Sequence, residues 1–340
     1  MKLSAQLQAR TRTASRLATT KARPSQRNFY HTRATSYHGD TTTSPAWQSF
    51  TDRVVGEWDG VCATFDVDGE PRELPEYYVP QAYRDWDVQL YDWQSQCSMN
   101  STEEGGLSCV TRRMMPTVGC EADAIAFTEE VPEDLICGNS NAFFSAQGHA
   151  TQSPGDAMVD DKAFDCKAEH ILTLGNDRRI RMVHLLKKMG PERQWRVQGI
   201  EVHVEKKDSE YHGRRELTGC GGGMDPFAKT VQQSVDEVGA TFAGGRASAS
   251  GFALAAGTVI EWKRQTWDFK SAVGGLTVVG LPKQTWTGFS CSPDDDGRVV
   301  LRVLAGALRE DGASMVVARQ VSVDGVLMEA ELLDVAVEVR

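Results

Sequence analysis

From Gly56 onward, the sequence consists of short alternating runs of apolar and polar residues separated by tight turns. The turn sequences include Asp68-Gly69, Asp311-Gly312 and Asp324-Gly325, and these residue pairs favour two-residue hairpins. Hairpins join antiparallel strands, whereas parallel strands need crossover connections of about a dozen residues or more. The pattern therefore predicts an all-β protein made of antiparallel sheets, with few and short helices.

The alternating runs fall into two groups. The first group predicts strands at 58–67, 86–96, 107–115, 124–129, 142–149, 164–174, 178–188 and 194–206. A meander of about eight strands can close into a barrel with room for side chains or one small ligand. The second group predicts a smaller or partly open barrel, with strands at 257–270, 275–281, 284–290, 298–309, 314–323 and 326–339.

This grouping predicts two β domains. Residues 46–208 form the N-terminal barrel and residues 257–340 the C-terminal barrel-like domain. Residues 209–256 are rich in glycine and alanine, and they are predicted to form a linker with one helix at 226–238. No nucleophile-elbow, zinc-protease or phosphate-loop motif occurs in the sequence.

The first residues differ in charge from the rest of the chain. Residues 1–39 contain eight Lys or Arg, many Ser and Thr, and no Asp or Glu. This composition is typical of an organellar transit peptide, so residues 1–45 are predicted to be a disordered leader and the mature protein to lie in the chloroplast stroma. The segment Arg27-Asn28-Phe29-Tyr30 also suits a mitochondrial processing site, and a basic arm that contacts nucleic acid or membrane is a third interpretation. A short helix is predicted to begin at Pro45.

The remainder of the chain is acidic. From Asp40 on there are 29 basic and 47 acidic residues, a net charge of −18. Nucleic-acid binding needs a basic face, so it is not expected, whereas the acidic surface could meet a protein partner. No run approaches the roughly 20 apolar residues of a membrane-spanning helix.

The eight cysteines predict free thiols. They contain no Cys-x-x-Cys pair, which weighs against a zinc site or a redox motif of that kind, and no metal is expected. Cys97, Cys109, Cys120 and Cys137 are close enough in sequence for a regulatory disulfide among them. The aromatic residues between 77 and 93 either line a barrel mouth or pack between strands.

Two segments carry a resemblance to a known family. Gly56-Glu57-Trp58-Asp59-Gly60 resembles the Gly-x-Trp signature at the first strand of lipocalin-like (calycin) barrels, and Leu281-Pro282 with Trp286 resembles part of plastid and cyanobacterial calycin-like proteins. The mature chain resembles uncharacterised cyanobacterial and chloroplast proteins with two lipocalin-like barrels, distant relatives of bilin lyases. The resemblance implies that Trp58 plugs the closed end of the barrel. Fatty-acid-binding calycins close with Arg-x-Tyr, whereas Arg319-Gln320-Val321 here lacks the tyrosine.

The hairpin around Gly175-Asn176-Asp177 places two histidines on one face. Strand alternation puts His170 and His184 on the apolar face of their strands, and the turn makes them diagonal neighbours about 7 Å apart or less. The two imidazoles could contact a ligand such as a tetrapyrrole, or bond to neighbouring side chains or a water. His203, with Glu201 and Glu205, is predicted to face water.

Arg319 lies on an apolar stripe of the strand before Asp324-Gly325. An unpaired buried charge costs several kcal/mol, so its partner is either a protein carboxylate or an anionic ligand group.

Three hypotheses about function follow. The first is a plastid protein that binds a small, largely apolar molecule, a tetrapyrrole or lipid, near His170, His184, Trp58 and Arg319. The second is a non-enzymatic scaffold or assembly factor whose barrels are filled by side chains. The third is a pigment- or lipid-modifying enzyme, for which Cys166 is the candidate nucleophile. A void above roughly 300 Å³ would favour the ligand.

Overall fold

The structure is a computed structural model. It describes residues 35–36, 45–102, 106–114, 127–135, 141–160, 162–214, 227–253, 258–261 and 265–337. The predicted leader lies almost entirely outside these residues, as do Cys120 and Cys137. Residues 32–340 belong to one compact unit.

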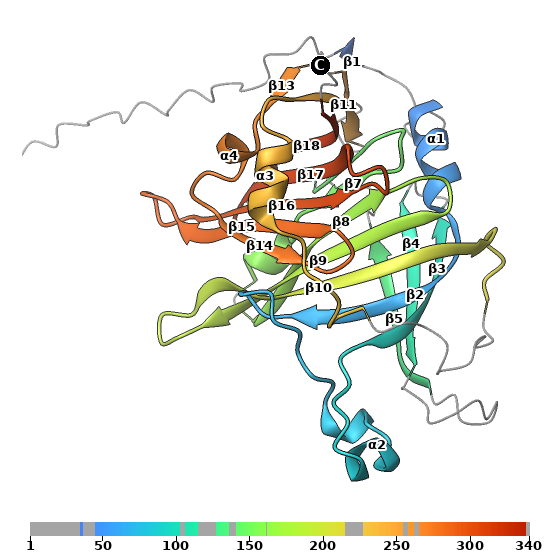
Figure 1. Cartoon of the computed structure of the whole chain (residues 1–340). Coiled ribbons are helices and arrows are strands. Elements are labelled where there is room, and N and C mark those ends of the chain that lie inside the picture. The colour runs from blue at the N-terminus through green and yellow to red at the C-terminus, as the bar shows by residue number, and fades with distance from the viewer. Residues whose placement is uncertain are drawn as a thin grey trace, which may run out of the picture. The chain divides into compact units, whose positions relative to one another are not determined.

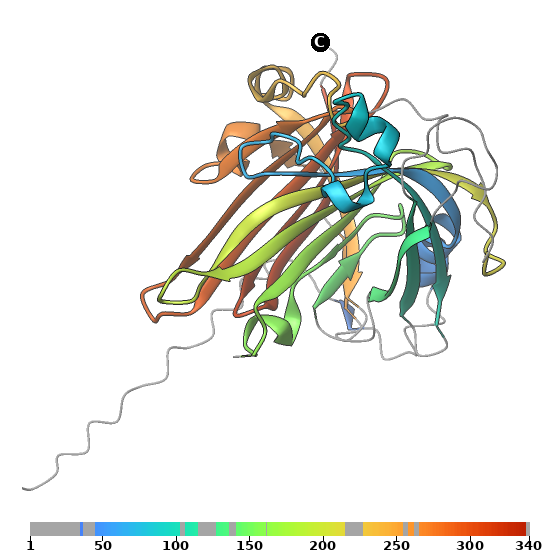
Figure 2. The same ribbon diagram turned by 90° about the horizontal axis from the view of Figure 1, so that it is seen from below.

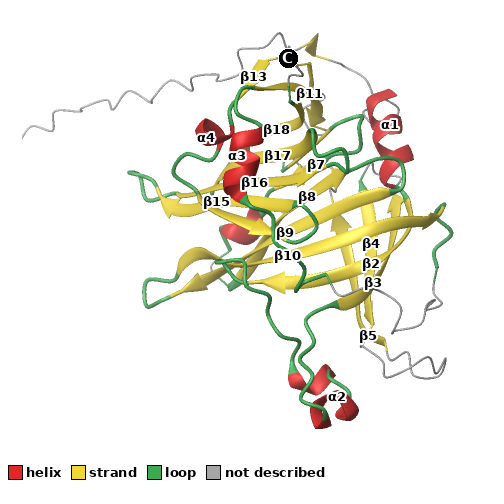
Figure 3. Cartoon of the chain, viewed as in Figure 1, coloured by secondary structure: helices red, strands yellow, loops and turns green. Residues whose placement is uncertain are grey.

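Strands dominate the described chain, as the turn pattern predicts (Figure 3). The strands of the N-terminal part are β1 (Thr35–Ser36), β2 (Gly56–Phe65), β3 (Trp93–Ser101), β4 (Leu107–Met114), β5 (Phe127–Leu135), β6 (Ala142–Phe144), β7 (Ala150–Gln152), β8 (Asp165–Thr173), β9 (Arg178–Met189) and β10 (Gln194–Ser209). Those of the C-terminal part are β11 (Gly245–Ala253), β12 (Thr258–Glu261), β13 (Gln265–Trp267), β14 (Thr277–Leu281), β15 (Thr285–Pro293), β16 (Val299–Leu308), β17 (Ser314–Val323) and β18 (Val326–Ala336). The helices are α1 (Pro45–Val54), η2 (Glu76–Tyr78), α2 (Gln81–Asp85), η4 (Gly155–Met158), α3 (Val235–Thr241) and α4 (Phe269–Ala272).

The strands form two antiparallel sheets that share β11. The first sheet has the order β5-β4-β3-β2-β10-β9-β8-β7-β6-β11-β12-β1. The second has the order β14-β15-β16-β17-β18-β11-β13. Residues Arg246–Ala249 of β11 pair with β18, and residues 250–253 pair with β12. The predicted linker therefore contains a strand that joins both sheets.

The first sheet curls into a half-barrel, and the second sheet packs against the outer face of its β7–β10 part (Figures 1 and 2). The side chains between the two sheets form the largest core cluster, which includes Met182, Ile200, Leu301 and Ala318. On the inner, concave side, α1 packs Trp47 and other apolar residues against β2, β3 and β4. We call this concave side the lumen.

The local predictions of pairing are confirmed. Ala168 pairs with His184 and His170 with Met182, as the turn at 175–177 requires. The register of β10 against β9 shifts between Val197 and Gly199, which marks a β-bulge. The strand predicted at 86–96 begins only at Trp93, because residues 86–92 form a turn and an irregular segment that follow α2.

Candidate functional site

The polar face of the β8–β9–β10 meander lines the lumen and does not face water. Glu201, His203 and Glu205 are 8%, 2% and 3% exposed, so the prediction that they face solvent is wrong. They lie opposite the basic side chains of β9, with Glu205 paired to Arg179 and His203 to Arg181 in the strand register. The sheet can bury this face because the charges on neighbouring strands are complementary.

Six of these side chains are connected by ion pairs and hydrogen bonds, and we call this group the lumen network: Glu169, Arg179, Arg181, Glu201, His203 and Glu205. Glu205 Oε2 accepts hydrogen bonds from Arg179 Nε at 2.6 Å and from Arg181 Nε at 3.1 Å. Arg181 Nη1 donates to Glu169 Oε1 at 3.1 Å, and Arg181 Nη2 donates to His203 Nδ1 at 3.3 Å. Because His203 Nδ1 accepts from an arginine, its Nε2 carries the proton and donates to Glu201 Oε1 at 2.7 Å.

The network holds the carboxylates of Glu201 and Glu205 in the ionised form. Burial opposes ionisation of Glu205, but the charges of Arg179 and Arg181 outweigh it and lower the pKa to about 2. Burial likewise opposes ionisation of Glu201, but the hydrogen bond from His203 and the charges of Arg113 and Arg181 lower that pKa to about 2. The lumen therefore keeps fixed, paired charges at neutral pH.

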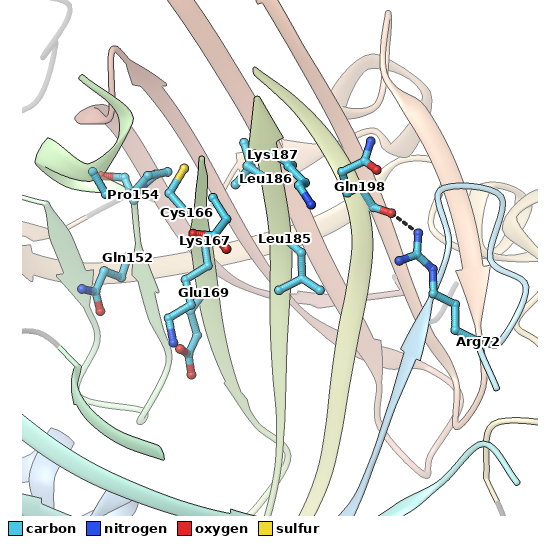
Figure 4. A pocket seen from close by; sticks show the side chains of 13 residues that line it. Arg72, Gln152, Pro154, Cys166, Lys167, Glu169, Leu185, Leu186, Lys187 and Gln198 are labelled. Atoms are coloured by element: carbon cyan, nitrogen blue, oxygen red, sulfur yellow. Dashed lines mark hydrogen bonds between the residues drawn. The ribbon is translucent and has the colours of Figure 1, made fainter. Parts of the chain in front are cut away.

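One side of the lumen opens into a cleft of about 750 Å³. Its walls come from β7, η4, β8, β9 and the bulge of β10, as Figure 4 shows. Apolar atoms come from Pro154, Leu185 and neighbouring residues, and cations from Arg72, Lys167 and Lys187. The guanidinium of Arg72 donates to the backbone carbonyl of Gln198 and so ties the segment after β2 to the bulge.

Glu169 connects this cleft to the lumen network. Its side chain lines the cleft and is 4% exposed. Oε1 binds Arg181, whereas Oε2 has no hydrogen-bond partner among the described residues. A buried carboxylate oxygen without a donor is costly, so Oε2 is suited to accept a hydrogen bond from a bound molecule or from water.

His170 and His184 lie between the two sheets and do not line the cleft. Their ring centroids are 5.4 Å apart, so the predicted proximity is confirmed. His184 Nε2 donates to Thr287 Oγ1 at 2.7 Å, because that hydroxyl itself donates to the Leu304 carbonyl. His170 Nδ1 bonds to Thr151 Oγ1 at 2.9 Å. Burial lowers the pKa of His170 to about 3, and burial together with His170 lowers the pKa of His184, so both rings are neutral.

The other two predicted ligand contacts also lie away from the cleft. Trp58 is fully buried in the lumen at the α1 end, where Nε1 donates to the Val54 carbonyl at 3.0 Å. The Arg179 guanidinium lies 3.9 Å from the Trp58 ring centroid. Arg319 is partly exposed and pairs with Glu329 at 3.3 Å and Glu331 at 3.4 Å. The structure thus brings the two histidines together and leaves Trp58 and Arg319 separate from them.

Sequence reasoning missed the lumen network and Glu169. It placed the apolar face of β9 inside a barrel, whereas that face packs on the second sheet and the charged face lines the lumen. The sequence pattern that could have indicated the network is the pairing of opposite charges across the β9–β10 hairpin, where acidic residues of β10 lie opposite arginines of β9. Within the described part of the chain, no three His, Cys, Asp or Glu side chains are grouped as metal ligands.

Comparisons with known proteins assign no activity to this site. No family model matches the chain, and no curated protein matches it. The chain is similar in structure to a protein of unknown function from Nostoc punctiforme that belongs to the DUF3598 family, with 12% sequence identity and a TM-score of 0.47. The match covers 86% of this chain and 98% of that chain. None of the helices in the described ranges is long and apolar enough to cross a membrane.

Proposed function

We propose that the protein binds a small, largely apolar molecule in the cleft that opens from the lumen. The observation that carries this proposal is the buried Glu169 Oε2, which lies at the cleft without a donor among the described residues. The volume of about 750 Å³ lies in the range of roughly 300 to 1,000 Å³ typical of small-molecule sites. The lipocalin-like relationship belongs to the same proposal, supported by the half-barrel and by Trp58 at its α1 end.

The charges at the cleft favour a tetrapyrrole over a lipid. A linear tetrapyrrole has pyrrole N–H groups that donate hydrogen bonds and carboxylate side chains that accept them. The pyrrole N–H groups can donate to Glu169. The carboxylates can pair with the cations that line the cleft, which are Lys167, Lys187 and Arg72. An ionised fatty acid has no donor for Glu169, so it would leave Oε2 unsatisfied.

Titration with biliverdin tests this proposal, with oleate as the competing ligand. We expect biliverdin to quench tryptophan fluorescence with saturation, and Glu169→Gln to weaken binding by about tenfold or more, because charge-assisted hydrogen bonds contribute about 1.5–3 kcal/mol. Lys187→Gln, an exposed position in the cleft, should weaken it less. Lys206→Gln is the matched control, since Lys206 is exposed but outside this cleft. Equal affinity in the wild type and the Glu169 variant would refute the proposed contact.

A plastid location is the second part of the proposal, and it rests on the acid-free, basic composition of residues 1–39. Fusing residues 1–45 to a fluorescent reporter tests it. Import into chloroplasts is the expected result, and import into mitochondria would support the alternative instead.

A scaffold function is a second candidate, favoured by the arm around α2. This arm projects from the body of the molecule (Figure 1), and it exposes Tyr77 by 73% and Trp86 by 62%. Glu76, Asp85 and Asp87 lie beside these rings in the sequence. Exposed aromatic residues of this kind often anchor protein partners. The enzyme hypothesis has less support. Burial and the neighbouring Cys291 and Asp165 raise the pKa of Cys166 to about 12, so this thiol stays protonated and is a poor nucleophile.

A further inference from the structure

Two cysteines meet at the α1 end of the lumen, away from the cleft. Cys97 lies on β3 and Cys109 on β4, and their Sγ atoms are 3.0 Å apart. The register pairs Cys97 with Thr111 and Met99 with Cys109, so the two thiols are diagonal neighbours on adjacent antiparallel strands. Both side chains are fully buried within the apolar cluster beneath α1.

The lumen network supplies a cation to one of these sulfurs. Arg179 Nη2 lies 3.2 Å from Cys97 Sγ, while Arg179 Nε binds Glu205. The hydrogen bond from Cys109 lowers the pKa of Cys97, whereas the same contact and burial raise the pKa of Cys109. Of the two sulfurs, Cys97 therefore ionises more readily, and Cys109 is its hydrogen-bond donor.

The remaining described cysteines lack this arrangement. Cys62 is as deeply buried as the pair, and burial raises its pKa to about 12. Burial also raises the pKa of Cys166 to about 12 and that of Cys291 to about 11. Thiolate character therefore favours Cys97 among the cysteines that the structure describes, and because this thiol is fully buried, the oxidant that reaches it has to be as small as hydrogen peroxide.

We propose that Cys97 and Cys109 are a dithiol that peroxide oxidises to a disulfide between β3 and β4. The Cys97 thiolate attacks one oxygen of hydrogen peroxide, the O–O bond breaks, and the leaving hydroxide takes up a proton as water. The Cys109 sulfur then attacks the Cys97 sulfenic acid, the S–O bond breaks, and a second water leaves with the Cys109 proton. Two thiols and one peroxide thus give one disulfide and two waters.

Peptide mapping of the full chain tests the proposal. The reduced protein is treated with one to ten equivalents of hydrogen peroxide, unfolded, and alkylated with N-ethylmaleimide. Trypsin leaves both cysteines on one peptide, since no Lys or Arg lies between them, whereas cleavage after Glu103 or Glu104 separates them. We expect a linked pair of peptides from this second digest, a loss of two alkylated thiols, and full reversal by dithiothreitol.

Single substitutions locate the reaction. Cys62→Ser is the matched control, because Cys62 is equally buried and should leave the linked product unchanged. Cys97→Ser should abolish it and leave Cys109 alkylated, and Arg179→Lys should slow the oxidation. If the wild-type chain consumes peroxide while Cys97 and Cys109 both remain alkylated, or if Cys97 proceeds to sulfinic acid without a linked product, the proposal is wrong. The wild-type map decides between these outcomes even where a variant fails to fold.

Discussion

Acid should loosen the contact between the two sheets through His170 and His184. Both rings are neutral in the folded protein, and burial lowers the pKa of His170 to about 3. An unfolded histidine has a pKa of about 6.5. The unfolded chain therefore binds protons first as the pH falls, so stability from these groups is complete above pH 6.5 and is lost between about pH 6.5 and 3.

The size of the loss follows from the distance below pH 6.5. At pH 5, protonation of each histidine stabilises the unfolded chain by about 2 kcal/mol, since each pH unit below the pKa contributes about 1.36 kcal/mol. The pair should therefore lower the free energy of unfolding by about 4 kcal/mol between pH 7 and pH 5. The pKa values of Glu201 and Glu205 lie at about 2, and unfolded glutamates titrate near 4.5, so these carboxylates contribute little above pH 5.

Urea unfolding of the full chain at pH 7 and pH 5 measures this loss. His170→Gln and His184→Gln should each reduce it to about 2 kcal/mol, and the double variant should nearly remove it. His212→Gln is the control, because that side chain is exposed and should leave the loss unchanged. A double variant that loses as much stability as the wild type would refute the assignment to these histidines.

Three other predictions concern stability and binding. Glu205→Gln should lower the free energy of unfolding by about 3–5 kcal/mol, because two buried arginines lose their shared carboxylate. A decrease below 1 kcal/mol in chemical unfolding would show that these ion pairs do not stabilise the fold. Gly306→Ala should cost about 3 kcal/mol, since a Cβ would lie 2.1–2.4 Å from the buried indole of Trp286, and an unchanged melting temperature would show that the indole can move. Arg319→Leu should leave biliverdin affinity unchanged and cost about 1 kcal/mol or less, because its partners are partly exposed protein carboxylates; lost binding would place a ligand there.

Local signals predicted most strands and the pairing of β8 with β9, but they missed β11 and predicted a single strand at 142–149 in place of β6 and β7. The turn at 175–177 fixes the register of β8 and β9, and that register brings His170 and His184 together. The segment before Trp93 is rich in aromatic residues, which favour strands, yet Asp87 has a φ of 53° and the chain forms α2 and a loop. Side-chain packing of the arm overrides the strand preference there.

The candidate site could not be predicted because it depends on which face of the first sheet becomes concave. Alternation shows that Arg181 and His184 lie on opposite faces, but it does not show which face meets the second sheet. Packing against β14–β18 decides this, and those strands are more than 90 residues later in the sequence.

The strand β11 has a consequence for how the protein unfolds. Its first residues pair with β18 in the second sheet, and its last residues pair with β12 in the first sheet. Removing β11 would uncover unpaired backbone groups on both sheets at once, which is costly for each. The two sheets should therefore gain and lose their structure together, and cutting the chain beside β11 should give two unstable fragments in place of two domains.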